Sequence, residues 1–169
     1  MEIVSLVMQE DNPWFQKIAA NRYTPPYSGI EKHSDGNPGT TGTAFSRLVA
    51  TIFLDDISID SGALNYVPGS HLLHFDRDDP NYKSPTNEEI LAGDFIPAEL
   101  KAGSVLFRVP CVWHSVSPIK HLRRYISVSY TIRGPMSSWD MANVMELVEK
   151  RKHIDLAGIP EELRELWVR

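Results

Sequence analysis

The residues with the clearest chemical potential lie in the stretch EKHSDGNPG, where His33 and Asp35 are two positions apart. On an extended chain, alternate side chains point to the same face. An imidazole and a carboxylate can therefore face one space and provide two ligands for a metal ion. The pattern is common by chance, and a surface loop with a hydrogen-bonded aspartate would also produce it. A metal site requires a third ligand from another segment.

His114 is the best candidate for the third ligand. It lies between apolar residues in GSVLFRVPCVWHSVSP, a stretch typical of two short strands. A lone histidine in such a place is more often a hydrogen-bonded core residue than a ligand. Together with His33 and Asp35, however, it completes a set of two histidines and one carboxylate. Such a set binds one face of an octahedral iron(II) ion and leaves positions open for substrate and oxygen.

The elements that must position these residues are mostly short strands. Twelve prolines and ten glycines separate many short apolar segments, a pattern typical of a strand-rich domain. The sequence predicts strands over residues 2–8, 19–24, 46–54, 63–67, 104–109, 113–116 and 124–132.

Two further segments have a different character. The polar stretch 76–97 predicts a surface loop at the rim of the site, with one short helix at 87–91 that Thr86 caps. Apolar residues at helical spacing predict a helical tail over residues 136–169. We therefore expect one domain, residues 1–169, with a β-barrel core over 1–135 and this tail.

Composition limits the class of protein. The chain has 169 residues, of which 42% are hydrophobic and 23% charged, as in soluble globular domains. A net charge of -5 without a basic cluster argues against nucleic acid as a partner. No segment is long and apolar enough for a membrane span, and the start lacks the basic flank of a signal peptide. The single cysteine, Cys111, fits a reducing compartment, so we expect a cytoplasmic protein.

The order of four motifs resembles the iron(II)- and 2-oxoglutarate-dependent dioxygenases. These are His-x-Asp, GALNYVPGSH, GSVLFRVPCVWHSVSP and RRYISVSY. The second is most similar to the phytanoyl-CoA dioxygenase branch, and HSVSPIKHLRRY also resembles the prolyl-hydroxylase branch. The resemblance covers residues 18–133 and implies a mainly β fold, the double-stranded β-helix, which is a jelly-roll or cupin-like barrel.

The same resemblance implies a cofactor set. It assigns His33, Asp35 and His114 as the catalytic ligands of Fe(II), with 2-oxoglutarate as cosubstrate and molecular oxygen as oxidant. It further implies an arginine for the remote carboxylate of 2-oxoglutarate, since a planar guanidinium is the best partner for that group. Arg123 and Arg124 both follow the distal histidine at a suitable distance.

Strand alternation distinguishes these two arginines. Arg123 shares its face with Tyr125 and Ser127, and a hydroxyl suits a carboxylate pocket, so we expect Arg123 and Ser127 to bind the cosubstrate. Arg124 falls on the opposite face, where a surface salt bridge is expected. Thr51, in the middle of SRLVATIFLDD, is a further candidate for the cosubstrate pocket or, equally, a buried strand threonine.

The expected reaction is hydroxylation of a small organic or carrier-bound substrate. Related halogenases replace the carboxylate ligand by a small residue, whereas Asp35 is present here. Two alternatives remain open: a cupin-like metal-dependent isomerase or hydrolase that uses no 2-oxoglutarate, and a non-catalytic barrel that acts as a binding module. Fewer residues precede His33 than family members usually carry, so the chain is a minimal core, part of a longer protein, or a subunit of a homo-oligomer.

Overall fold

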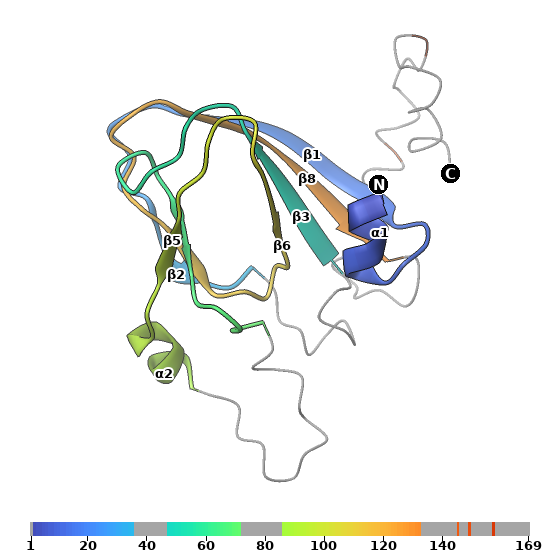
Figure 1. The fold of residues 1–169 in the computed structure, drawn as a ribbon, viewed down its shortest axis with the longest axis horizontal. Helices are drawn as coiled ribbons and strands as arrows, with labels where there is room; N and C mark the ends of the chain where they lie inside the picture. The colour runs from blue at the N-terminus through green and yellow to red at the C-terminus, as the bar shows by residue number, and fades with distance from the viewer. Residues whose placement is uncertain are drawn as a thin grey trace.

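The protein folds into two antiparallel sheets that face each other (Figure 1). The computed structural model describes residues 2–35, 47–71 and 86–132, together with Met145, Glu149 and Ala157. The strands are β1 Trp14–Tyr23, β2 Ile30–His33, β3 Arg47–Phe53, β4 Leu64–Tyr66, β5 Ile96–Ala98, β6 Val105–Arg108, β7 His114–Val116 and β8 Arg123–Thr131. The helices are α1 Glu2–Met8 and α2 Asn87–Ala92.

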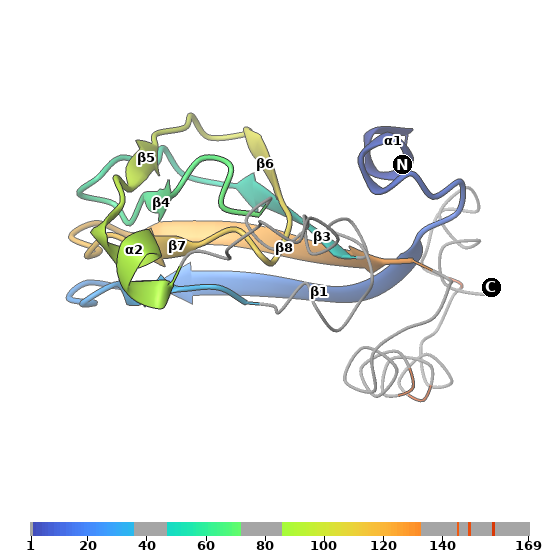
Figure 2. The ribbon, with the colours of Figure 1, turned by 90° about the horizontal axis from the view of Figure 1, so that it is seen from below.

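The chain passes repeatedly from one sheet to the other. The major sheet has the order β1-β8-β3-β6, and the minor sheet has the order β2-β7-β4-β5. In Figure 1, β1, β8 and β3 run side by side, with β2 and β5 across the barrel from them; Figure 2 shows how much longer β1 and β8 are than the strands of the minor sheet. This interleaved arrangement is the jelly-roll barrel, so the predicted mainly β fold class is confirmed.

Most of the predicted strands are present. β3, β4, β6, β7 and β8 coincide with the predicted segments to within one or two residues, while β1 begins at Trp14, well before the expected start. The sequence did not predict β2 and β5. These strands are short and mostly exposed, so they lack the apolar alternation that identifies a strand, and they form by pairing with β7 and β4.

The prediction of a strand over residues 2–8 is wrong, because Glu2–Met8 forms helix α1. Ile, Val and Val in this segment favour a strand, but Val4 and Met8 are four residues apart and lie on one stripe of the helix. They pack against Leu48 and Cys111 in a buried cluster on the outer side of the major sheet. Tertiary packing of this stripe therefore prevails over the β-propensity of single residues.

The predicted helix after Thr86 is confirmed as α2. The Thr86 hydroxyl accepts a hydrogen bond from the Glu89 N–H at 3.2 Å, and the Glu89 carboxylate accepts one from the Thr86 N–H at 2.7 Å. This reciprocal pair is a capping box. The Lys32 ammonium donates to the Leu91 carbonyl at 2.8 Å, so the end of α2 is held against β2.

Two predicted segments lie largely beyond the described residues. They are residues 76–85 of the expected rim loop and the expected helical tail, of which only Met145, Glu149 and Ala157 are described. Among the helices that the structure describes, none is long and apolar enough to cross a membrane.

Candidate metal centre

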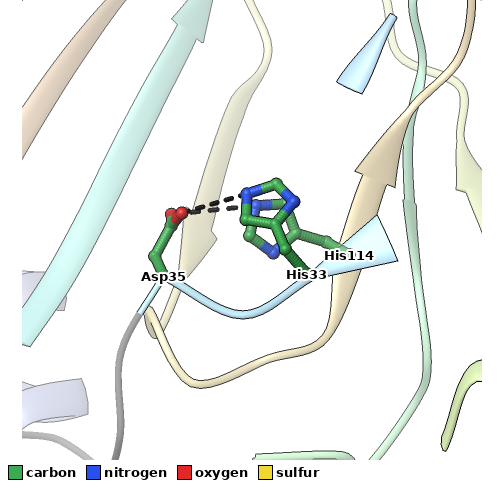
Figure 3. Close-up of side chains that lie close together, drawn as sticks. All are labelled: His33, Asp35 and His114. Atoms are coloured by element: carbon green, nitrogen blue, oxygen red, sulfur yellow. Dashed lines mark hydrogen bonds and ion pairs between the residues drawn. The ribbon is translucent and has the colours of Figure 1, made fainter. Parts of the chain in front are cut away.

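Strand pairing brings the three predicted ligands together. His33 ends β2 and His114 begins β7, and the two residues are direct partners in the antiparallel register. Asp35 follows β2, and its N–H donates to the Pro110 carbonyl at 3.0 Å, which fixes the backbone next to the loop before β7. The three side chains point toward one another (Figure 3), and one ligand atom from each lies within 4.8 Å of the others.

The distances describe a compact cluster. His33 Nε2 lies 3.1 Å from Asp35 Oδ1, and His114 Nε2 lies 3.7 Å from Asp35 Oδ2. The two imidazole ring centres are 4.3 Å apart. Two imidazole nitrogens and a carboxylate therefore converge on one small volume, as the sequence predicted from their types and spacing.

Backbone carbonyls orient both imidazoles. His33 Nδ1 lies 2.7 Å from the Glu31 carbonyl oxygen, and His114 Nδ1 lies 2.9 Å from the Val112 carbonyl oxygen. Because a carbonyl oxygen only accepts hydrogen bonds, each Nδ1 must carry the proton. Nε2 is then the ring nitrogen of each histidine that faces the cluster, as metal ligation through Nε2 requires.

Burial and nearby charges keep His114 neutral and Asp35 ionised. Burial, reinforced by the positive charge of Arg108, lowers the pKa of His114 to about 4, so the ring is uncharged at neutral pH. Burial alone would raise the pKa of Asp35. The charge and hydrogen bond of Arg108, with smaller contributions from His114 and His33, outweigh burial and lower it. These are the protonation states in which both groups bind metal ions.

The GALNYVPGSH segment contains β4, and it supports β7 on the side opposite β2. The Ser70 hydroxyl accepts a hydrogen bond from the Trp113 N–H at 3.0 Å, and the Val67 N–H donates to the Trp113 carbonyl at 3.0 Å. Ser70 is fully buried, and the turn closes with its own N–H bonded to the Val67 carbonyl. The N–H and the carbonyl of Trp113 are therefore both hydrogen-bonded, which fixes the residue immediately before His114.

Thr51 and Ser127 lie on the same side of the major sheet as the ligand cluster. Arg108 of β6 contacts Asp35, so its face of the sheet is the site face. Leu106 lies two positions before Arg108 on β6 and pairs with Thr51 of β3. Thr51 in turn pairs with Ser127 of β8. Register partners share a face, and so do residues two apart on a strand. Both hydroxyls therefore belong to the site face, where both residues are half-buried.

Arg123 is buried on this same face. Only 4% of its surface is exposed, and its guanidinium carbon lies 4.8 Å from the Tyr125 ring centre and 5.8 Å from that of Phe53. Burial lowers the pKa of Arg123, although a guanidinium remains charged at neutral pH. Its Nε has no hydrogen-bond partner in the described part of the chain. A buried cation without a counter-ion is costly, so this geometry favours an anionic ligand.

Arg124 points the other way, as strand alternation predicted. Its Nη2 lies 2.6 Å from Asp55 Oδ1, and its Nε lies 3.1 Å from Asp55 Oδ2. The side chain is half exposed, and the pair is a surface salt bridge. The two consecutive arginines are thus separated into an interior and a surface environment.

Sequence reasoning missed Arg108 and the Phe53 ring beside Arg123. The Arg108 Nη2 lies 2.6 Å from Asp35 Oδ2, which is the shortest contact to the ligand cluster among the hydrogen bonds described. Alternation in VLFRVP places Leu106 and Arg108 on one face. The sequence contains no signal for which face of β6 points to the site, because that depends on the pairing with β3.

Three solved structures with the same fold illustrate the likeness. AviO1 from Streptomyces viridochromogenes aligns with a TM-score of 0.64 and 21% identity, over 80% of this chain and 58% of its own. SnoN, a non-heme alpha-ketoglutarate-dependent epimerase from nogalamycin biosynthesis, aligns with a TM-score of 0.61 and 20% identity, over 78% and 51%. HygX from Streptomyces hygroscopicus, solved with nickel and 2-oxoglutarate bound, aligns with a TM-score of 0.58 and 17% identity, over 80% of this chain and 64% of its own.

The chain thus spans between about half and two thirds of the length of these structures. A search of curated protein sequences found no match. The sequence model of the phytanoyl-CoA dioxygenase family matches residues 8–120, more than half of the chain and a range that includes His33, Asp35 and His114. By this match, the chain belongs to the phytanoyl-CoA dioxygenase (PhyH) family.

Proposed function

We propose that the protein is a non-haem iron(II)- and 2-oxoglutarate-dependent oxygenase. His33, Asp35 and His114 would bind the iron(II), and Arg123, Thr51 and Ser127 would bind 2-oxoglutarate. One observation carries the proposal: a cluster of two Nε2 atoms and a carboxylate lies on the same side of the major sheet as a buried arginine with no carboxylate partner in the described residues. Membership of the phytanoyl-CoA dioxygenase family supports it.

The donor set fits iron(II) better than the common alternatives. Two imidazoles and one carboxylate are the ligands typical of non-haem iron oxygenases, and three positions of an octahedral ion remain open. Cys111 is the single cysteine, so a structural zinc site built from several thiolates is ruled out. When bound, iron(II) would activate molecular oxygen, which is the oxidant, and 2-oxoglutarate would supply two of the electrons by its conversion to succinate and carbon dioxide.

The chain itself would bind and orient the cosubstrate. The Arg123 guanidinium would pair with the carboxylate of 2-oxoglutarate remote from the metal, in a charge-assisted hydrogen bond. Phe53 and Tyr125 pack against the guanidinium, so this carboxylate would be held with little water around it. The hydroxyls of Thr51 and Ser127 lie opposite each other in the register and offer further donors on that face.

Hydroxylation of a small organic or carrier-bound substrate is the reaction that we propose. The Asp35 carboxylate occupies the position that a halogenase would leave open for a halide. Structures of this fold also include an epimerase and a carbocyclase, at 20% and 19% identity. Product analysis separates these outcomes: hydroxylation adds one oxygen atom, epimerisation keeps the mass and inverts one centre, and ring closure removes two hydrogen atoms.

The two other candidate functions account for less of the site. A cupin-like isomerase or hydrolase without 2-oxoglutarate would leave the buried Arg123 cation without a ligand. A non-catalytic barrel would have no need for the complete ligand set, and His33, Asp35 and His114 are all present with their Nε2 atoms and carboxylate converging.

The test is an anaerobic titration of the metal-free protein with iron(II) and 2-oxoglutarate, followed by the visible charge-transfer band of the chelate. The proposal predicts the band for the native protein and for Arg124→Ala. It predicts no band for Asp35→Ala and a much higher 2-oxoglutarate requirement for Arg123→Ala. Absence of the band in the native protein, with iron bound, would favour the isomerase or hydrolase.

A further inference from the structure

Arg108 is the described residue in closest contact with the ligand cluster that the resemblance does not assign. It ends β6, its side chain is only 13% exposed, and its Nη2 lies 2.6 Å from Asp35 Oδ2. We propose that Arg108 is a positioning residue that occupies Asp35 Oδ2 and so makes Asp35 a single-oxygen metal ligand. This inference rests on the proposed function, because it assumes that Asp35 binds the metal.

The number of ligand atoms matters for the proposed chemistry. An octahedral ion has six positions, of which two imidazoles and one carboxylate oxygen would take three. A chelating 2-oxoglutarate needs two more, and oxygen needs the last. A carboxylate that bound through both oxygens would take one of these positions. A guanidinium that holds Oδ2 would compete with the metal for this oxygen, which lies 3.7 Å from His114 Nε2, while Oδ1 faces His33 Nε2 at 3.1 Å.

The backbone of Asp35 is held independently of Arg108. Its N–H donates to the Pro110 carbonyl at 3.0 Å, and the Ser34 hydroxyl donates to the same carbonyl at 3.4 Å. Removal of the Arg108 side chain therefore leaves the position of Asp35 in the chain fixed. What it releases is the rotation of the carboxylate, which is the freedom that positioning would control, together with a longer contact of 3.5 Å between Arg108 Nη1 and His114 Nδ1.

The orienting contact of Arg108 would strengthen metal binding by Asp35, whereas its positive charge would weaken it. A cation beside the carboxylate draws negative charge away from the metal and repels the metal ion itself. If charge alone mattered, removal of Arg108 would strengthen metal binding. If orientation dominates, removal should weaken binding about tenfold to a hundredfold, as is typical when an outer partner of a metal ligand is lost. The sign of the change in affinity therefore distinguishes the two roles.

The experiment measures cobalt(II) binding to the metal-free protein by calorimetric titration, together with the visible d–d spectrum of bound cobalt(II). Arg108→Met keeps an unbranched apolar side chain and removes the charge and the donors. We expect its dissociation constant to rise about tenfold to a hundredfold and its d–d spectrum to change. Arg108→Lys, which keeps the charge and one donor group, should recover part of the affinity.

Arg124→Met is the matched control. Arg124 also makes a 2.6 Å contact to an aspartate, Asp55, but on the opposite face of the sheet. The Arg124→Met substitution should leave the cobalt(II) affinity and spectrum unchanged, even if it lowers the thermal stability as much as Arg108→Met does. A loss of affinity in both methionine variants would assign the effect to stability and overturn the proposal.

Two other results would also overturn the inference: cobalt(II) affinity of Arg108→Met equal to or above that of the native protein, or an unchanged d–d spectrum. Asp35→Ala separates these from failure of the proposed function. If Asp35→Ala binds cobalt(II) as well as the native protein does, the metal centre itself is misassigned. If Asp35→Ala loses binding while Arg108→Met keeps it, only the role of Arg108 is wrong.

Discussion

Asp35 makes contacts with three side chains at once: His33, His114 and Arg108. Loss of a residue that supports a metal ligand typically lowers metal affinity about tenfold to a hundredfold. We expect Asp35→Ala to lower it by more, because Asp35 is itself a proposed ligand. Turnover should be lost as well. The fold should survive, since Asp35 is half exposed and its backbone contact to Pro110 does not involve the side chain.

Calorimetric metal titration and circular dichroism of Asp35→Ala check this expectation together. Asp35→Asn is a useful companion variant, because it keeps the size of the side chain and an oxygen acceptor for Arg108. Native metal affinity in Asp35→Ala, with an intact fold, would contradict the assignment of the metal centre.

Arg123 and Arg124 form a second test at the residue scale. If Arg123 binds the remote carboxylate of 2-oxoglutarate, Arg123→Ala leaves that carboxylate unpaired in a partly dry pocket, at a cost of about 2–4 kcal/mol. The 2-oxoglutarate requirement should therefore rise about thirtyfold or more, because each 1.4 kcal/mol corresponds to a factor of ten. Metal affinity without 2-oxoglutarate should change little, because Arg123 is not one of the proposed metal ligands.

Arg124→Ala is the control for this measurement. Its partner Asp55 lies on the outer face, and an exposed pair contributes about 1 kcal/mol or less to stability. The 2-oxoglutarate requirement should remain at the native value, as measured by the charge-transfer titration. The reverse ranking of the two variants would mean that Arg124 binds the cosubstrate.

At the scale of elements, the turn before β4 constrains Arg123, and so the proposed cosubstrate pocket, through Gly62. Its φ is +83°, and a Cβ at this position would lie 2.6 Å from Ile119 Cγ1 and 3.2 Å from Arg123 Cδ. Gly62→Ala should therefore destabilise the protein and displace Arg123, which raises the 2-oxoglutarate requirement. This contact gives a structural reason for the glycine of the GALNYVPGSH motif.

Gly103→Ala provides the matched control. Gly103 has nearly the same φ, +86°, but among the described residues no atom beyond its chain neighbours lies within 4 Å of a Cβ placed there. Both alanine variants share the cost of left-handed backbone, about 1–2 kcal/mol. Urea unfolding should show a larger loss for Gly62→Ala, and only that variant should weaken 2-oxoglutarate binding. Equal losses and equal binding would mean that the turn does not constrain Arg123.

At the scale of the whole molecule, metal binding should be visible as thermal stability. A metal ion that binds only the folded state stabilises it by about 2.7 kcal/mol at a hundred times its dissociation constant. For a domain of this size each kcal/mol corresponds to about 2–4 °C, so the melting temperature should rise by about 5–10 °C. Manganese(II) is a suitable probe, since it resists oxidation in air.

The thermal shift should depend on the residues of the site in a defined order. Asp35→Ala should show no shift with manganese(II). 2-Oxoglutarate should add a further shift to the native protein only when the metal is present, and this second shift should be lost in Arg123→Ala. A 2-oxoglutarate shift without metal would indicate that the cosubstrate does not chelate the ion.

The sequence by itself determined the types of residue at the site and their order along the chain. His33, Asp35 and His114 could be selected because metal ligation requires particular side chains, and an extended chain puts positions 33 and 35 on one face. The separation of Arg123 from Arg124 was predictable for the same reason, since the period of a strand is two residues whatever its partners are.

Only the tertiary structure decided the features that depend on pairing between distant segments. Helix α1 forms because its apolar stripe packs against Leu48 and Cys111, although its residues favour a strand. The contact between Arg108 and Asp35 depends on which face of β6 points into the barrel, and that follows from its register with β3. Local preferences are encoded within a few residues, whereas register and packing are set by contacts between segments far apart in sequence.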